Sequence, residues 1–193
     1  SIDDSTPDSE AICLFATLAQ EKAFQSTAME RWANALFNAT VDEPDPQRCF
    51  ELAAAIAQIR RRRDTPGIAL HQARALSNAT AAETNPQRCV ELANAIAQIN
   101  QEYHTPGIAL QQAKALFNAT VLEHEAQRRA ELFDAISEIR RQHDTPGIAL
   151  QQAKALVNAA AVETDPQRRA ELVDAIAQIR QQHDTPDVAL QQA

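Results

Sequence analysis

The chain has 193 residues, of which 45% are hydrophobic and 4% aromatic, and it contains only three glycines. This length suffices for one or two domains, and an alanine-rich, glycine-poor composition favours closely packed helices over a sheet. The formal net charge of −8 lacks the basic excess that is typical of nucleic-acid-binding proteins. The composition therefore predicts an all-α protein that is not built around a basic surface.

Cysteines and hydropathy indicate the compartment. The three cysteines, Cys13, Cys49 and Cys89, cannot form a closed set of disulfides, and no CxxC pair is present, so we expect free thiols. No apolar run approaches the ~18 residues of a membrane span, and no signal-peptide core is visible. We expect a soluble protein with no membrane partner, in a reducing compartment such as the cytoplasm. Because the sequence ends inside a copy of the repeat described below, we expect it to be a fragment of a longer protein.

A repeat of 40 residues organises the chain. Thr-Pro steps begin at Thr65, Thr105, Thr145 and Thr185, and a second landmark with the same spacing begins at Asp45. Spacing without insertions is typical of repeat arrays. The predicted divisions are a polar lead-in (1–5), a degenerate N-terminal capping hairpin (6–44) with a first helix over Pro7 to Phe24, repeats at 45–84, 85–124 and 125–164, and a repeat at 165–193 truncated within its second helix. Positions 40 residues apart are called a column here, numbered by the member in repeat 45–84.

Each repeat is predicted to hold two helices. Asp45 followed by proline is a helix-start signal, and the helix should end near Arg62–Asp64. Thr65 with its proline starts a second helix that reaches about Ala82. The repeat beginning Glu125-Ala126 lacks the proline and should start less sharply. Thr-Pro-Gly therefore marks the turn between helices, and its glycine needs no positive φ, since aspartate replaces it in the last copy.

The two helices differ in their apolar faces. Leu52, Ala55, Ile56 and Ile59 follow helical periodicity and predict the buried side of the first helix. The second helix is apolar over most of its circumference, so it must be buried between neighbours. Its polar arc comprises columns 71, 74 and 78. Column 72 (Gln72, Gln112 and Gln152) falls inside the apolar arc, and we expect its amides to bond a neighbouring loop or carbonyl.

The sequence "AELFDAISEIRRQHDTPGIALQQAKAL" from Ala130, followed by "TDPQRRAEL" from Thr164, resembles a unit of the tetratricopeptide-like superfamily of helical repeats. The 40-residue period is longer than the ~34 residues of that repeat and approaches HEAT and armadillo lengths, and the Trp, Gly and Tyr signature is missing. The resemblance implies an all-α, right-handed α-solenoid of tandem antiparallel helical hairpins. It also implies that first helices line the concave face.

A candidate partner-binding surface follows from that resemblance. On the first helices, the arc opposite the apolar side carries columns 54, 58 and 61, whose residues vary between copies. The predicted binding residues are Ala54, Gln58, Arg61, Asn94, Gln98, Gln101, Asp134, Glu138, Arg141, Asp174, Gln178 and Gln181. We expect a protein or peptide partner and a non-catalytic scaffold or adaptor function.

The sequence favours no enzyme, metal or cofactor. It contains no phosphate-binding loop, nucleophile elbow or zinc-protease motif. His143 and His183 share a column and should lie on the order of 10 Å apart, using helix spacing, too far to ligate one zinc together. The basic run at Ile59–Asp64 is expected to be solvated, and Asn-Ala-Thr at Asn38, Asn78 and Asn118 recurs with the repeat, so we do not expect glycosylation.

Two alternative functions stay open. The residue pairs before each Thr-Pro step vary strongly (Arg62-Arg63, Glu102-Tyr103, Gln142-His143 and Gln182-His183), as in repeats that read one base per unit. Acidic charge and few aromatic residues weigh against this nucleic-acid reader. The other alternative is a structural spacer within a larger protein, such as a secreted bacterial effector.

Overall fold

The computed structural model describes residues 27–183, and these residues form helices without any strand. A helical stretch over residues 27–38 comes first. The following helices are α2 (Pro46–Arg62), α3 (Pro66–Ala82), α4 (Pro86–Tyr103), α5 (Pro106–Leu122), α6 (Ala126–Gln142), α7 (Pro146–Val162) and α8 (Pro166–Gln182). The all-α prediction is confirmed. The expected helix over Pro7 to Phe24 and the second helix of the last repeat lie outside the described residues.

The helix starts agree with the predicted capping signals. Asp45 accepts a hydrogen bond from the backbone N–H of Gln47 at 2.9 Å, and Thr65 accepts one from the N–H of Ile68 at 3.2 Å. Proline occupies the first turn after both caps, where its missing N–H leaves no bond unmade. Glu125 makes no side-chain cap bond to α6, yet α6 begins at Ala126, in the same column as the other first helices, so the start is uncapped but no less sharp than predicted for the others.

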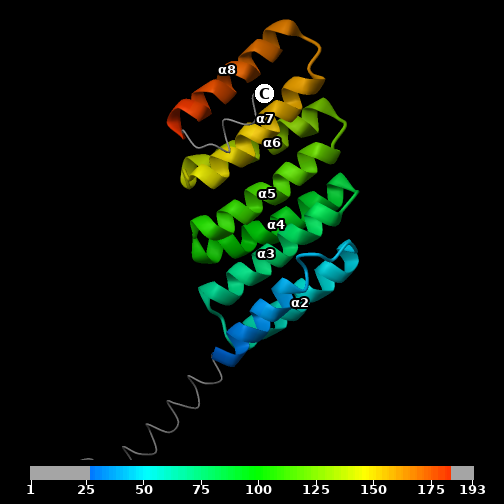
Figure 1. Cartoon of the computed structure of the whole chain (residues 1–193), viewed down its shortest axis with the longest axis vertical. Helices are drawn as coiled ribbons and strands as arrows, with labels where there is room; N and C mark the ends of the chain where they lie inside the picture. The colour runs from blue at the N-terminus through cyan, green and yellow to red at the C-terminus, as the bar shows by residue number, and fades with distance from the viewer. Residues whose placement is uncertain (1–26, 184–193) are drawn as a thin grey trace, which may run out of the picture.

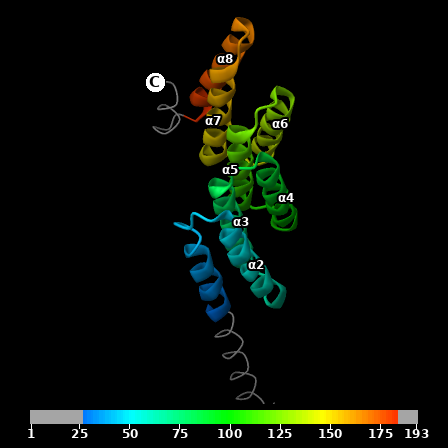
Figure 2. The ribbon, with the colours of Figure 1, turned by 90° about the vertical axis from the view of Figure 1, so that its right-hand side faces the viewer.

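The helices form an elongated stack in which neighbours along the chain pack together (Figure 1). Contacts also join α3 to α5 and α5 to α7, whereas the first helices α2, α4 and α6 make no comparable contact with one another. Figure 2 shows α3, α5 and α7 on one side and α2, α4 and α6 on the other. We call α3, α5 and α7 the second-helix layer. Its fully buried alanines, such as Ala73 and Ala113, allow helix axes to approach closely.

The apolar core runs between the two sides of the stack. Ile56 is fully buried, and so are its counterparts Ile96 and Ile136, as the periodicity predicts. The buried side of the first helices extends further than the predicted apolar stripe, since Cys49 is 0% and Ala53 1% exposed. Leu52, Ala55 and Ile59 of the predicted stripe are only partly buried, so the helix turns the small residues of columns 49 and 53 most directly towards its neighbours.

The glycines of the Thr-Pro-Gly turns serve close packing between repeats. None of them has positive φ, which confirms the prediction. A Cβ at Gly147 would lie 3.2 Å from both terminal methyl carbons of Leu110, and one at Gly107 would lie 3.4 Å from Leu70 Cδ1. At Gly67 the nearest atom would be 3.7 Å away, on Glu30. Glycine therefore makes room for a leucine of the preceding repeat at the later two turns.

Gly67→Ala is expected to stabilise the chain by about 0.4–1 kcal/mol, because alanine restricts the unfolded chain and fits the available space. Gly147→Ala should gain less or destabilise, because Leu110 must move. Urea denaturation followed by circular dichroism would measure both. Equal stabilisation by the two substitutions would contradict the close approach at Gly147.

Candidate interaction surfaces

The predicted partner-binding surface lies on α2, α4, α6 and α8. All twelve of its residues are exposed. The side-chain bonds observed for them stay within one helix, as between Arg61 and Gln58 at 3.3 Å and between Arg141 and Glu138 at 2.5 Å. We call these twelve residues the first-helix surface. Packing of the array does not use them.

Charge changes along the first-helix surface. Its members on α2 are Ala54, Gln58 and Arg61, with no carboxylate among them. On α6 the same columns carry Asp134 and Glu138 beside one arginine. The surface therefore becomes more acidic from α2 towards α6.

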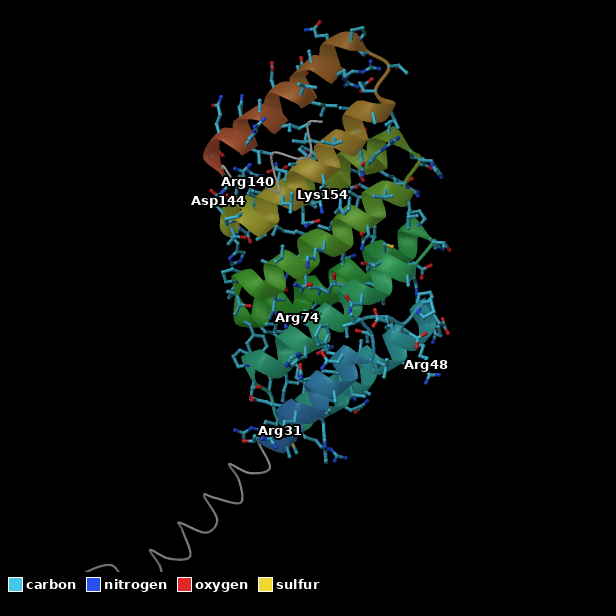
Figure 3. All side chains as sticks on the ribbon, viewed as in Figure 1. Arg31, Arg48, Arg74, Arg140, Asp144 and Lys154 are labelled. Atoms are coloured by element: carbon cyan, nitrogen blue, oxygen red, sulfur yellow. The ribbon has the colours of Figure 1, made fainter. Side chains whose placement is uncertain are left out.

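A second surface of opposite charge lies on the second-helix layer. Column 74 places one cation on each helix: Arg74 on α3, Lys114 on α5 and Lys154 on α7. Figure 3 shows Arg74 and Lys154 over this layer. Arg74 lies 5.6 Å from the ring centroid of Phe37, and Lys154 lies 6.0 Å from that of Phe117. We call the three cations the cationic row.

Column 71 departs from the predicted polar arc. Gln111 and Gln151 are only 7% and 6% exposed, so two members of that arc are buried. His71 is half-buried, and its Nδ1 is buried without a hydrogen-bond partner. Burial lowers the pKa of His71, and the nearby positive charge of Arg74 lowers it further. The ring therefore adds no charge to the cationic row near neutral pH.

The turn after α2 holds a polar cluster that joins two repeats. Arg60 Nε contacts Asp64 Oδ1 at 2.9 Å, and Arg60 Nη1 donates to Gln72 Oε1 at 3.3 Å. Its guanidinium also pairs with Glu102 and lies 5.3 Å from the ring centroid of Tyr103. Tyr103 in turn donates its hydroxyl proton to Asp64.

The same cluster recurs after α6. Arg140 contacts Asp144 at 3.1 Å and donates to Gln152 at 2.9 Å and to Gln182. His183 Nε2 lies 2.8 Å from Asp144 Oδ1. Figure 3 shows Arg140 beside Asp144 at one end of the layer. We call the two groups the turn clusters.

The intervening repeat has lost the residues that build a turn cluster. Asn100 and His104 occupy the positions of the arginine and the aspartate. Asn100 is 8% exposed and its Oδ1 has no partner, and His104 ends α4 with φ 48°. The joint between the repeats at 85–124 and 125–164 therefore lacks this brace within the described residues.

These clusters correct two expectations. Arg60 belongs to the basic run expected to be solvated, yet its side chain is only 15% exposed. Gln72 and Gln152 bond an arginine side chain rather than a loop or carbonyl. The variable pairs Glu102-Tyr103 and Gln182-His183 contact the preceding repeat. The sequence holds a signal for these contacts that the predictions above do not use: an arginine and an aspartate four residues apart lie one repeat before each of the two pairs.

The Asn-Ala-Thr segments join neighbouring repeats through side-chain hydrogen bonds. Asn78 Nδ2 donates to Thr40 Oγ1 at 2.8 Å, and Asn118 Nδ2 donates to Thr80 Oγ1 at 2.9 Å. Thr80 Oγ1 in turn donates to the carbonyl of Ser77 at 2.7 Å. Each asparagine is therefore held by the threonine of the preceding copy.

Column 49 donates to backbone carbonyls in the last turn of the preceding helix or in the segment just after it. The thiol of Cys89 donates to the carbonyl of Thr80 at 3.6 Å, and Arg129 donates to the carbonyl of His124 at 3.2 Å. Cysteine and arginine thus perform the same task in different copies. Burial raises the pKa of Cys89 to about 11, so its thiol is protonated and poorly reactive at neutral pH.

A hollow of about 500 Å³ lies between α6, α7 and α8, with Phe133, Val162 and Leu172 among its lining residues. No group of three or more His, Cys, Asp or Glu in residues 27–183 is arranged to hold a metal ion. None of the helices in that range is long and apolar enough to cross a membrane.

Comparisons with protein-family models, with curated proteins and with solved structures found no significant match to this chain.

Proposed function

We propose that the chain is a right-handed solenoid of 40-residue antiparallel helical hairpins that acts as a non-catalytic protein-binding scaffold. Its partner is a protein or peptide that contacts the first-helix surface. The observation that supports this function is the exposure of all twelve residues, whose observed side-chain bonds stay within single helices. A surface that repeats with the array and is not used for packing is available to a partner.

Asp134→Ala, Arg141→Ala and Asp174→Ala, combined in one variant, should weaken partner binding about tenfold or more while the array stays folded. Exposed charges at an interface contribute to rate and specificity, and none of the three is buried. A partner would first be recovered with the wild-type chain, and its affinity for purified variants would then be measured by calorimetry.

A matched control combines Glu51→Ala, Arg128→Ala and Glu171→Ala. It also removes two carboxylates and one arginine from exposed positions of first helices, but outside columns 54, 58 and 61. Its affinity should equal that of the wild type. Unchanged affinity of the first variant would refute the assigned surface.

The two alternatives predict different results. A nucleic-acid reader would retain RNA or DNA on a filter, with affinity falling steeply as salt rises. A structural spacer would recover no specific partner under mild conditions.

A further inference from the structure

The cationic row is an ordered feature of the second-helix layer. Its residues occupy one column of the repeat, and α3 packs beside α5 and α5 beside α7 (Figure 1), so the three charges follow one another across the layer. Figure 3 labels the first and the last of them, Arg74 and Lys154. Packed helices have axes ~8–10 Å apart, which sets the approximate spacing of the cations.

No carboxylate within residues 27–183 forms an ion pair with Arg74, Lys114 or Lys154. The helices α3, α5 and α7 contain no aspartate or glutamate at all, although the chain as a whole has a net charge of −8. Within residues 27–183 the acidic residues lie on the first helices and connecting segments, apart from Glu30 in the helical stretch 27–38. The cationic row is therefore a local positive surface on an acidic chain.

The three cations also act on one another. Burial lowers the pKa of Lys114, and the positive charges of Arg74 and Lys154 lower it further. Repulsion between like charges disfavours the charged form, and a nearby carboxylate would reverse that effect. An anionic ligand would therefore relieve a repulsion that folding leaves in place.

The spacing of the cations indicates the form of such a ligand. An extended peptide rises ~3.3 Å per residue, so three residues span the distance between neighbouring helix axes. Phe37 beside Arg74 and Phe117 beside Lys154 offer apolar contact next to the charges.

We infer that the second-helix layer binds an extended acidic segment of a protein, with carboxylates about three residues apart, across Arg74, Lys114 and Lys154. This surface is separate from the first-helix surface, and the inference does not depend on it. A protein segment fits better than a nucleic acid, because the overall negative charge opposes the approach of a continuous polyanion.

The test uses a fluorescein-labelled, end-blocked decapeptide with glutamate at every third position, separated by serine and alanine. Anisotropy at low ionic strength measures its binding to the full chain. The variant Arg74→Gln, Lys114→Gln, Lys154→Gln should bind about tenfold more weakly, since each exposed ion pair changes affinity by a few-fold. A control that combines Arg62→Gln, Arg128→Gln and Arg168→Gln removes three exposed cations from first helices and should bind as the wild type does.

Two further peptides test the chemistry and the spacing. A peptide with glutamine in place of glutamate should not bind, and one with three adjacent glutamates should bind more weakly than the spaced peptide. If the triple variant unfolds, the single variant Lys114→Gln replaces it, because Lys114 makes none of the observed cation–ring contacts. This single variant should weaken binding about two- to fivefold. Circular dichroism verifies the fold of each variant.

Equal weakening by the row variant and its control would show a response to net charge alone and would overturn the inference. Failure of the spaced peptide to bind would also overturn it, as would tighter binding of a uridine oligonucleotide through the same row. Loss of binding in the variant of Asp134, Arg141 and Asp174 would show that the peptide uses the first-helix surface instead.

Discussion

Ile108→Ala is expected to destabilise the chain by about 3 kcal/mol, within the range for truncation of a buried isoleucine. Ile108 is fully buried in α5, which packs against α3, α4, α6 and α7. In a repeat array each unit is stabilised mainly by its neighbours. Weakening the central helix α5 should therefore let the N-terminal and C-terminal parts of the array unfold in separate transitions. Urea denaturation followed by circular dichroism should show a lower midpoint and a broader or two-step transition.

Val121→Ala provides the matched control for that experiment. Val121 lies in the same helix but is 53% exposed, so its truncation should change the free energy of unfolding by less than about 0.5 kcal/mol. A loss below about 1 kcal/mol for Ile108→Ala would contradict the tight packing around α5.

Arg140→Met is expected to destabilise the chain by about 1–2 kcal/mol, because the turn cluster after α6 loses several hydrogen bonds to one charged group. The arginine side chain is only 14% exposed, and it connects Asp144 to Gln152 and Gln182. Arg141→Met is the control, since the Arg141 side chain is 73% exposed, and it should be close to neutral.

The loss caused by Arg140→Met should depend on pH. Burial opposes ionisation of Asp144, but the hydrogen bonds from Arg140 and His183 outweigh it and lower the pKa of the carboxyl from its ordinary 3.8. A lowered pKa stabilises the folded state above the unfolded value, and that contribution is lost as pH falls through the folded value. The difference between wild type and variant should therefore be full at pH 7 and shrink below about pH 4. A difference that does not change with pH would contradict a role for the Asp144 charge.

The helices were predictable because their signals are local. Thr65 caps α3 through a bond to a residue three positions away, and the proline that follows has no N–H to leave unpaired. The missing cap bond at Glu125 follows from the same chemistry. The exposure of columns 54, 58 and 61 was equally readable, because it depends only on helical periodicity and on the apolar stripe opposite.

The contacts between repeats were less accessible, and Gln111 and Tyr103 show why. Polarity predicts that Gln111 is exposed, yet close packing of alanine-rich helices buries it. Variation between copies predicts that the pair containing Tyr103 is available to a ligand, yet the Tyr103 hydroxyl reaches Asp64 of the preceding repeat. Both outcomes depend on how far one repeat is displaced from the next, which the 40-residue period does not specify.

The sequence by itself determined the helical class and the bounds of the helices, since both depend on residues within a few positions of one another, and the 40-residue period is visible in the spacing of its copies. Only the tertiary structure decided that Asn118 holds Thr80, that Cys89 bonds a carbonyl in the last turn of α3, and that three cations align across α3, α5 and α7. These features join residues about 40 positions apart or link one repeat to the next, and they arise only when close helix packing sets the distance between repeats.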